Sequence, residues 1–300
     1  GLSEPQMRQL QQQAAATAGL GARFRDEFKG GGQGPELVVV PAGRYTIGAP
    51  DAERKRYVDD GAKQEWADWE KPRLVGVARA FALAAREVTR GEFAAFVKAT
   101  GRAVQGSCWY WDKEWKQDGA RSWQAPGFEQ TDDHPVVCVS FADVSAYLQW
   151  LNGTSERYRL ASEAEWEFAA RAGTTSPRPW SDAAGFFARA WGAVKPGTTE
   201  PTSRACKYAN VADESLRSQL EWPATLNCSD GYPAAVPGAY FSKNNFGLYD
   251  MIGNVAEWTQ DCWNASHAGV GQDAKPRNTG DCSRRAVRGG PERRRAVGGS

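Results

Sequence analysis

The stretch from residue 244 to residue 258, NNFGLYDMIGNVAEW, most constrains what this chain can fold into. Large apolar and aromatic residues are mixed there with Asn, Gly, Asp and Glu. Neither the two-residue period of a strand nor the 3.6-residue period of a helix runs through it. Residue types that suit positive φ or close backbone approach occur at Asn245, Gly247, Gly253 and Asn254. The segment predicts a buried, irregular loop anchored by aromatic side chains.

A buried loop of this kind must satisfy its backbone carbonyl groups. Asp250 and Glu257 lie seven residues apart with glycine between them. Their carboxylates can satisfy such carbonyls through a shared hard cation. Two ordinary surface acids on a packed loop are the alternative, and the spacing leaves both interpretations open.

Residues 247–258 resemble the signature of the formylglycine-generating enzyme (sulfatase-modifying factor) superfamily. Three further segments are typical of that family: ELVVVPAGRYTIG at 36–48, EVTRGEFAAFVK at 87–98 and RLASEAEWEFAARAG at 159–173. The resemblance implies an α+β fold, the formylglycine-generating-enzyme-like variant of the C-type-lectin fold, loop-rich with little regular secondary structure.

The expected organisation has two parts. Residues 1–34 form a polar N-terminal segment, either a short helix or a linker, that ends in a glycine-rich hinge. Residues 35–300 form the family domain, with a C-terminal end that is shortened or diverged.

The composition excludes several classes of protein. The chain has 300 residues, 41% of them hydrophobic and 24% charged, which indicates a globular protein. A formal net charge of +1 argues against nucleic acid as a partner. No apolar run approaches the roughly 18 residues that a membrane span requires.

Six cysteines are present: Cys108, Cys138, Cys206, Cys228, Cys262 and Cys282. All lie in loop-like contexts, and we predict that they pair in sequential order, 108 with 138, 206 with 228 and 262 with 282. Three disulfides imply an oxidising compartment, hence a periplasmic or secreted protein. Six buried thiols in a cytosolic protein are the alternative. With two histidines, His134 and His267, in loop or surface positions and no Cys-x-x-Cys spacing, a zinc site is not expected.

Local patterns predict several elements. Residues 36–48 predict a hairpin that turns at Pro41-Ala-Gly43. Helices are predicted to begin after Thr89, Ser140 and Ser162, each followed three positions later by an acidic residue.

The carboxylates of Glu163, Glu165 and Glu167 fall at the start of the third predicted helix. They could indicate acid–base chemistry. We interpret them instead as a capped, solvated helix start, where acidic residues complement the helix dipole.

The resemblance implies structural calcium, one or two ions. One set of ligands is Asn210 and Asp230 through side chains and Val211 and Tyr232 through carbonyls. The other is Asp250 and Glu257 through side chains and Gly253 and Val255 through carbonyls. Calcium takes six to eight oxygen ligands and tolerates irregular geometry. The alternative is that these acids only accept hydrogen bonds from loop amides.

The chain departs from the pattern of the family's oxidases after residues 284–290, RRAVRGG. In those oxidases the Gly-Gly pair precedes two cysteines that bind copper, whereas residues 291–300 here read PERRRAVGGS. No copper is expected without thiolates, and two histidines do not build the iron site of the sulfoxide synthases. No catalytic residue is assigned.

We therefore expect a non-catalytic scaffold that binds a protein or small molecule, of the retroelement variable-protein type or a sensor type. The alternative is an oxidase of a peptide or peptide-derived substrate, of the formylglycine-generating or siderophore-maturation type. Candidate ligand contacts are Trp109, Trp111, Arg288, Arg293 and Arg294. The tryptophans could instead fill the core under a long loop, and the arginines could belong to a solvated tail.

Overall fold

The computed structural model describes residues 3–27, 33–59, 63–111, 115–153, 157–174, 205–220, 226, 228–290 and 295–298. Its helices are α1 (Glu4–Thr17), α2 (Asp51–Asp59), α3 (Gln64–Trp69), α4 (Arg90–Thr100), α5 (Phe141–Asn152), α6 (Glu163–Arg171), α8 (Ala205–Tyr208) and α9 (Glu214–Leu220). Its strands are β1 (Arg23–Glu27), β2 (Gln33–Val40), β3 (Gly43–Ile47), β4 (Arg73–Val77), β5 (Phe81–Ala84), β6 (Cys108–Trp111), β7 (Trp115–Asp118), β8 (Glu257–Trp263), β9 (Asp281–Arg288) and β10 (Arg295–Gly298). Long irregular connections join these elements, which confirms the predicted α+β, loop-rich fold.

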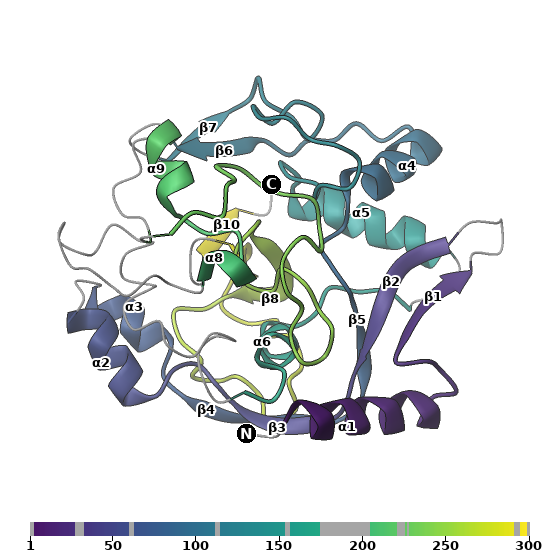
Figure 1. Ribbon diagram of the computed structural model, residues 1–300, viewed down its shortest axis with the longest axis vertical. Coiled ribbons are helices and arrows are strands. Elements are labelled where there is room, and N and C mark those ends of the chain that lie inside the picture. The colour runs from purple at the N-terminus through teal and green to yellow at the C-terminus, as the bar shows by residue number, and fades with distance from the viewer. Residues whose placement is uncertain are drawn as a thin grey trace.

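The strands form small antiparallel sheets. Two sheets have three strands each, in the orders β1-β2-β5 and β10-β9-β8, and β3-β4 and β6-β7 form two-stranded pairs. Figure 1 shows α6 near the middle of the molecule, the β6–β7 pair at one end, and α1 with β3 and β4 at the other. Each sheet is too small to enclose a core alone, so the core lies where sheets, α6 and loops meet.

The hairpin predicted over residues 36–48 is wrong. β2 pairs with β1 and β5, whereas β3 pairs with β4 in a different sheet. The segment Pro41–Ala42 is therefore a corner between two sheets. Partner choice depends on burial, and β2 is a central strand whose residues Val38 and Val40 are fully buried.

The loop that the sequence singled out lies in the main core. Phe246, Leu248 and Met251 are buried and pack in one cluster with residues of β2, β3, β4 and α6. The side chain of Asn244 organises the start of this loop. Its amide oxygen accepts hydrogen bonds from the N–H groups of Phe246 (3.0 Å) and Leu248 (3.1 Å), and its amide nitrogen donates to Ala169 O (2.8 Å).

The backbone of this loop takes the predicted irregular conformation. Positive φ occurs at Gly247, Asp250, Gly253 and Asn254. The irregular part ends before Glu257, because that residue begins β8. The prediction of a buried, irregular loop is thus confirmed.

The predicted helix starts are confirmed. The hydroxyl oxygens of Thr89, Ser140 and Ser162 accept hydrogen bonds from the N–H groups three residues later, at 3.1, 3.1 and 3.0 Å. Each satisfies an N–H that the first turn of a helix leaves unpaired.

Three disulfides join the loops. They link Cys108 with Cys138, Cys206 with Cys228 and Cys262 with Cys282, which confirms the predicted pairing. The first closes the long tryptophan-rich segment. The third ties β8 to β9, the two strands that flank the loop containing His267.

The N-terminal segment forms helix α1, the first of the two alternatives considered for it. Its residues Met7 and Ala15 are buried. The buried Gln11 amide donates to Val39 O and to Phe246 O, each at 2.8 Å. The hinge predicted over residues 30–34 falls partly within β2, at residues 33–34, and partly on residues 30–32, which lie outside the described residues.

Candidate functional site

Three buried carboxylates meet beside the core loop: Glu87, Asp250 and Glu257. Burial and then the charges of the other two carboxylates raise the pKa of Glu87 well above its usual range. Burial raises the pKa of Asp250, and it raises the pKa of Glu257 to about 7. Within the described part of the chain, Oε2 of Glu87 and Oδ1 of Asp250 accept no hydrogen bond. Buried like charges of this kind are stable when they share a proton or hold a cation.

One of the predicted backbone ligands, the carbonyl of Val255, lies near Glu257. A Cβ atom on Gly289 would lie 3.1 Å from Glu257 Oε1 and 3.2 Å from Val255 O, so both oxygens lie next to this glycine. The second oxygen of Glu257, Oε2, accepts a hydrogen bond from Trp166 Nε1 at 3.2 Å. Carboxylate and carbonyl oxygens together fit a hard divalent cation such as calcium. When bound, calcium would supply positive charge to the buried acids, held by Asp250, Glu257 and Val255.

Glu87 was missed as a member of this cluster. Its sequence neighbours placed it just before a helix, and nothing local marked it as buried. Asn254 Nδ2 donates to Glu87 Oε1 at 3.2 Å across 167 residues of sequence.

The other predicted calcium ligands also lie together. Asp230 Oδ2 accepts from the N–H of Val211 (2.9 Å), and its Oδ1 accepts from the N–H of Tyr232 (2.8 Å). Asn210 Nδ2 donates to Ala234 O at 2.6 Å. Burial, more than the neighbouring Asp213, raises the pKa of Asp230 to about 6. Asp230 therefore accepts loop amides in this structure, which is the alternative that the sequence left open.

The two predicted calcium segments are directly linked. The N–H of Asn254 donates to Asn210 O at 2.9 Å. A Cβ on Gly253 would lie 2.0 Å from the same oxygen, so only glycine fits there. The buried Asp213, which the sequence did not single out, accepts a hydrogen bond from the N–H of Asp230. Calcium at both places stays a prediction.

The acidic start of α6 is buried, not solvated. Glu163, Glu165 and Glu167 have 2%, 9% and 4% of their surface exposed. Glu165 binds the guanidinium of Arg159 through both carboxylate oxygens, each at 2.7 Å. The interpretation of a solvated helix start is wrong, because the three side chains are buried and paired with arginines. Arg159 and Arg171 come from nearby in the sequence, six residues before Glu165 and four residues after Glu167, whereas Arg288 comes from 121 residues after Glu167.

Arg288 is the central cation of this buried network. It contacts Glu167, lies 3.6 Å from Glu163 and 3.7 Å from Glu70, and stacks 5.5 Å from the ring centre of Trp166. Burial lowers the pKa of Arg288, but the three glutamates outweigh it and keep the pKa above its ordinary value. The Arg288 side chain is thus held by three glutamates and is 11% exposed, and its role as a ligand contact stays a prediction.

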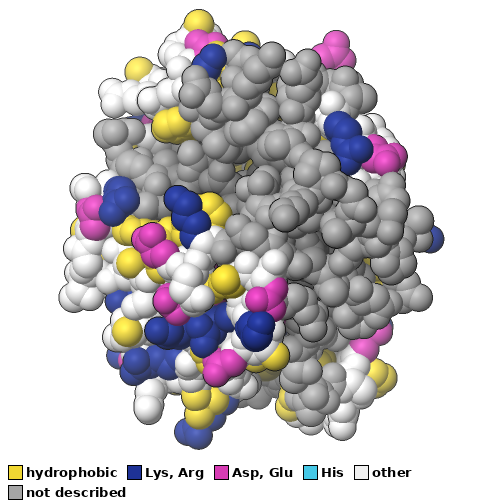
Figure 2. All heavy atoms as spheres, turned by 90° about the vertical axis from the view of Figure 1, so that its left-hand side faces the viewer, with side chains coloured by type: hydrophobic (Ala, Val, Ile, Leu, Met, Phe, Trp, Pro, Cys, Tyr) yellow, Lys and Arg dark blue, Asp and Glu magenta, His cyan; other side chains and the backbone are white. Residues whose placement is uncertain are grey.

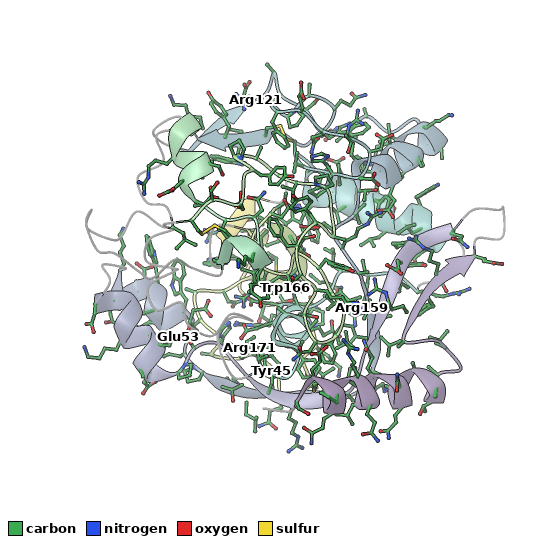
Figure 3. The ribbon with its side chains drawn as sticks, in the orientation of Figure 1. Tyr45, Glu53, Arg121, Arg159, Trp166 and Arg171 are labelled. Carbon is green, nitrogen blue, oxygen red and sulfur yellow. A yellow bond between two sulfur atoms is a disulfide. The ribbon has the colours of Figure 1, made fainter. Side chains whose placement is uncertain are left out.

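Figure 3 shows Trp166, Arg171 and Tyr45 close together around α6. The Tyr45 hydroxyl donates to Ala164 O at 2.6 Å. Burial raises the pKa of Tyr45 well above its usual range, and Glu167 adds to that effect. The phenol therefore stays neutral and acts as a hydrogen-bond donor to α6.

The predicted tryptophan contacts lie in the β6–β7 pair. Trp109 is 47% exposed, and Tyr110 beside it is covered by the guanidinium of Arg121 at 4.1 Å from the ring centre. Trp123 from the same disulfide-closed segment is buried. The side chain of Trp111 and residues 293 and 294 lie outside what the structure describes. The segment thus both fills the core and exposes an aromatic ring.

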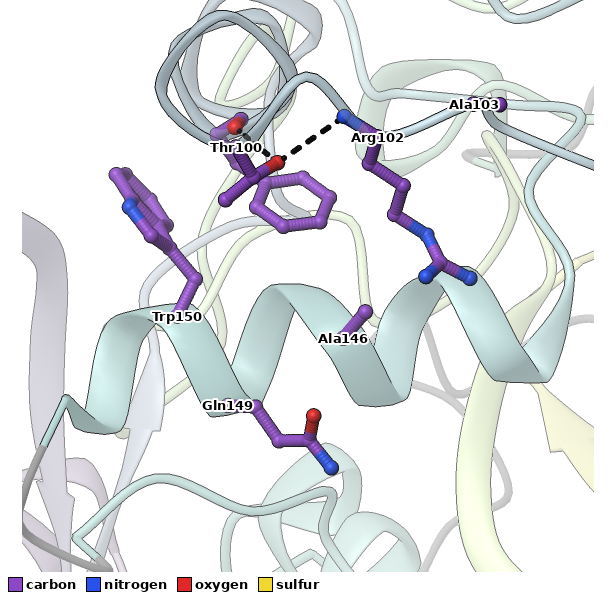
Figure 4. Close-up of a pocket in the computed structure, with 7 residues that line it drawn as sticks. Thr100, Arg102, Ala103, Ala146, Gln149 and Trp150 are labelled. Carbon is purple, nitrogen blue, oxygen red and sulfur yellow. Dashed lines mark hydrogen bonds between the residues drawn. The ribbon is translucent and has the colours of Figure 1, made fainter.

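A pocket between α4 and α5 was not predicted. It has a volume of about 570 Å³ and is lined by Phe96, Thr100, Arg102, Ala103, Ala146, Gln149 and Trp150 (Figure 4). Asp143 holds Arg102 at its rim at 2.9 Å. It is an open depression whose walls combine two aromatic rings with a few polar groups.

The described part of the face drawn in Figure 2 shows mixed charge. In the view of Figure 2, Lys and Arg side chains lie next to Asp and Glu side chains, with scattered hydrophobic ones between them. This agrees with a formal net charge of +1. No helix among the described residues combines the length and apolarity that crossing a bilayer requires.

The chain is similar in sequence to several known proteins. The sequence model of the sulfatase-modifying factor enzyme 1-like domain matches residues 25–295. Formylglycine-generating enzyme of Bos taurus is 28% identical over 266 residues, which cover 78% of this chain and 59% of that enzyme. This chain therefore spans less than two thirds of the length of the bovine relative. Inactive Cα-formylglycine-generating enzyme 2 of Mus musculus is 26% identical over 276 residues, 82% of this chain and 74% of that protein.

A solved structure resembles most of this chain. PvdO from Pseudomonas aeruginosa superposes with a TM-score of 0.67 and is 29% identical. The match covers 92% of this chain and 93% of that one.

Proposed function

Because this chain belongs to the sulfatase-modifying factor enzyme 1-like domain family, we propose that it is a calcium-stabilised binding domain without copper–thiolate oxidase activity. The observation that carries the proposal is the state of its cysteines. All six cysteines of this sequence are accounted for by the three disulfides. A disulfide offers no thiolate, and copper chemistry of the family's kind needs thiolate ligands.

The role of calcium in the proposal is structural. Asp250 and Glu257 are buried beside Glu87, with raised pKa values. A bound cation would let these carboxylates ionise without mutual repulsion. It would fix the core loop and, through the Asn210–Asn254 hydrogen bond, the loop next to it.

The ligand-binding surface in this proposal is the β6–β7 pair. The Trp109 ring is exposed, and the stacking of Arg121 on Tyr110 stiffens the strand that carries it. An exposed tryptophan supplies a large apolar contact with little loss of side-chain entropy. The ligand is a protein or a small molecule with an apolar or aromatic face.

The three disulfides support a periplasmic or secreted location. Such bonds persist in oxidising compartments and are rare where glutathione keeps thiols reduced. This location belongs to the proposal, together with calcium, which extracellular modules bind at millimolar concentration.

The competing function is an oxidase of a peptide or peptide-derived small molecule. The relationship to the bovine formylglycine-generating enzyme favours it. The relationship to the inactive mouse protein favours a member of the family without that activity.

The two functions predict different results in one assay. The protein is incubated under air with Cu(I) and a cysteine-containing peptide, and the peptide is examined by mass spectrometry. We expect no conversion of cysteine to the aldehyde, with a formylglycine-generating enzyme as positive control. Repeated turnover to the aldehyde would overturn the proposal.

The binding surface is tested on arrays of peptides and glycans. For ligands that the native protein retains, we expect Trp109→Ala to weaken binding about tenfold or more, as for a central aromatic anchor. The matched control is Leu74→Ala, which removes another exposed apolar side chain, from β4. Equal binding by both variants would remove Trp109 from the site.

A further inference from the structure

We propose that Glu70, Glu167 and His267 form a binding site for a divalent first-row metal ion, Zn²⁺ being the best match. One ligand atom from each lies within 4.8 Å of the others, and all three side chains are buried. The site is separate from both predicted calcium sites and goes beyond the proposed function. Its ligands come from the end of α3, from α6 and from the loop between β8 and β9.

The imidazole of His267 is the main evidence. This side chain is 1% exposed, and neither Nδ1 nor Nε2 has a hydrogen-bond partner among the described residues. A buried imidazole normally has its ring nitrogens paired, since unpaired polar atoms away from water are costly. An imidazole that is buried beside carboxylates, with neither ring nitrogen hydrogen-bonded, is suited to bind a metal.

The backbone is shaped to admit this ring. Gly48 has φ +84°, and a Cβ there would lie 3.0 Å from Nδ1 of His267 and 2.6 Å from Glu70 O. A glycine is therefore required for the imidazole and the end of α3 to approach each other. The N–H of Gly48 donates to Glu167 Oε1 at 2.9 Å, which fixes the second carboxylate in the same place.

The local charge favours an added cation. The charged groups that meet here are Glu70, Glu163, Glu167, Arg171 and Arg288. Three carboxylates thus face two guanidinium groups. Asp261, which raises the negative charge next to Glu163, is also buried. A divalent ion would offset this excess of buried negative charge.

Both arginines leave Glu167 able to bind a metal. Oε1 of Glu167 accepts from Gly48 and from Arg171, whereas Oε2 accepts from Arg288. A carboxylate oxygen has two lone pairs, so Oε2 can serve Arg288 and an ion together. Arg288 would then orient a metal ligand, as outer groups do in other metal sites.

The donor types select the metal. One imidazole with two carboxylates suits Zn²⁺ and similar ions, whereas Ca²⁺ and Mg²⁺ prefer sites made of oxygen alone. No thiolate competes, because every cysteine is in a disulfide. The expectation from sequence that zinc is absent considered only closely spaced motifs, and these ligands are about a hundred residues apart.

The chain offers a built-in control for the test, since His134 is its one other histidine. His134 is partly exposed, and its Nδ1 accepts from the N–H of Thr131 at 2.9 Å. The full chain is labelled with ¹⁵N-histidine and titrated with Zn²⁺ in excess Ca²⁺, so that oxygen-only sites are filled. We expect the ring resonances of His267 to shift with a stoichiometry of one, while those of His134 stay in place.

Variants provide the second measurement. His267→Gln should weaken Zn²⁺ binding by more than about 100-fold. Mutating a residue that only hydrogen-bonds to a metal ligand already lowers metal affinity by about 10–100-fold, and His267 is a ligand itself. His134→Gln should bind as the native protein does. Unshifted His267 resonances at saturating Zn²⁺ would overturn the proposal, and so would a shift at His134 alone. The labelled native protein gives this answer even where His267→Gln does not fold.

Discussion

At the scale of single residues, the molecule buries carboxylates that the sequence alone suggests are exposed. Asp261 is 3% exposed and accepts hydrogen bonds from the N–H groups of Glu163 (2.8 Å) and Arg277 (3.0 Å). Burial, and then the charge of Glu163, raise the pKa of Asp261 to about 6. Its ionised form is therefore less favourable in the folded chain than in the unfolded one.

The sign of this shift gives a pH prediction. The pKa of Asp261 is higher in the folded chain than in the unfolded chain, so its protonated form stabilises the fold at low pH. That stability is lost as pH rises from about 4 through about 6. Asp261→Asn should lose less stability over this range than the native protein, with a difference of about 1–3 kcal/mol. Denaturant unfolding from pH 4 to pH 8 measures it.

The control for this prediction is Glu129→Gln, which removes an exposed carboxylate. It should follow the native protein at every pH. If the difference between Asp261→Asn and the native protein does not change with pH, Asp261 does not titrate as described.

At the scale of elements, α6 is the helix on which the other parts depend. It contacts β3, β4, β8 and β9, and it carries Trp166, Glu163 and Glu167 into the buried network. Its N-cap, Ser162, is fully buried. The hydroxyl accepts from the N–H of Glu165 at 3.0 Å and donates to Ala274 O at 2.6 Å.

Ser162→Ala should destabilise the protein by about 1–3 kcal/mol, because it removes a cap and leaves a buried carbonyl without its donor. Ser3→Ala changes the exposed N-cap of α1 and should cost less than about 1 kcal/mol. Chemical denaturation of both variants compares them. Equal losses would mean that the contact with Ala274 contributes nothing.

Local sequence patterns predicted where helices begin better than they predicted which strands pair with one another. Thr89, Ser140 and Ser162 were identified as caps because a cap involves residues three positions apart. The pairing of β2 with β1 and β5 was missed because strand partners are chosen by tertiary burial. The predicted hairpin had the right composition but joined two different sheets.

The same contrast holds for the candidate sites. Asp250 and Glu257 could be recognised within one stretch of sequence. Glu87, which lies beside them in the fold, precedes Asp250 by 163 residues in the sequence. Glu167 was interpreted as solvated, and of its two arginine partners only Arg171 is near in sequence, whereas Arg288 is 121 residues away. His267 offered no signal at all, since only the folded chain brings Glu70 and Glu167 to it.

At the scale of the whole molecule, we propose that disulfides and bound calcium stabilise a fold whose sheets are small. Calcium at 100 times its dissociation constant should add about 2.7 kcal/mol to the stability, relative to the chelated protein. Thermal unfolding with CaCl₂ and with EGTA measures the difference. Asp250→Asn should reduce it, and Glu129→Gln should leave it unchanged. Identical melting of the native protein in both buffers would contradict structural calcium.

The central claim is that this family member works without free thiols, and a thiol count tests it most directly. The protein is denatured without reductant and titrated with a thiol reagent, then reduced and titrated again. We predict zero thiols before reduction and six after it, one for each cysteine of the sequence. Two or more thiols before reduction would contradict the account, because a pair of cysteines would then be free to bind copper.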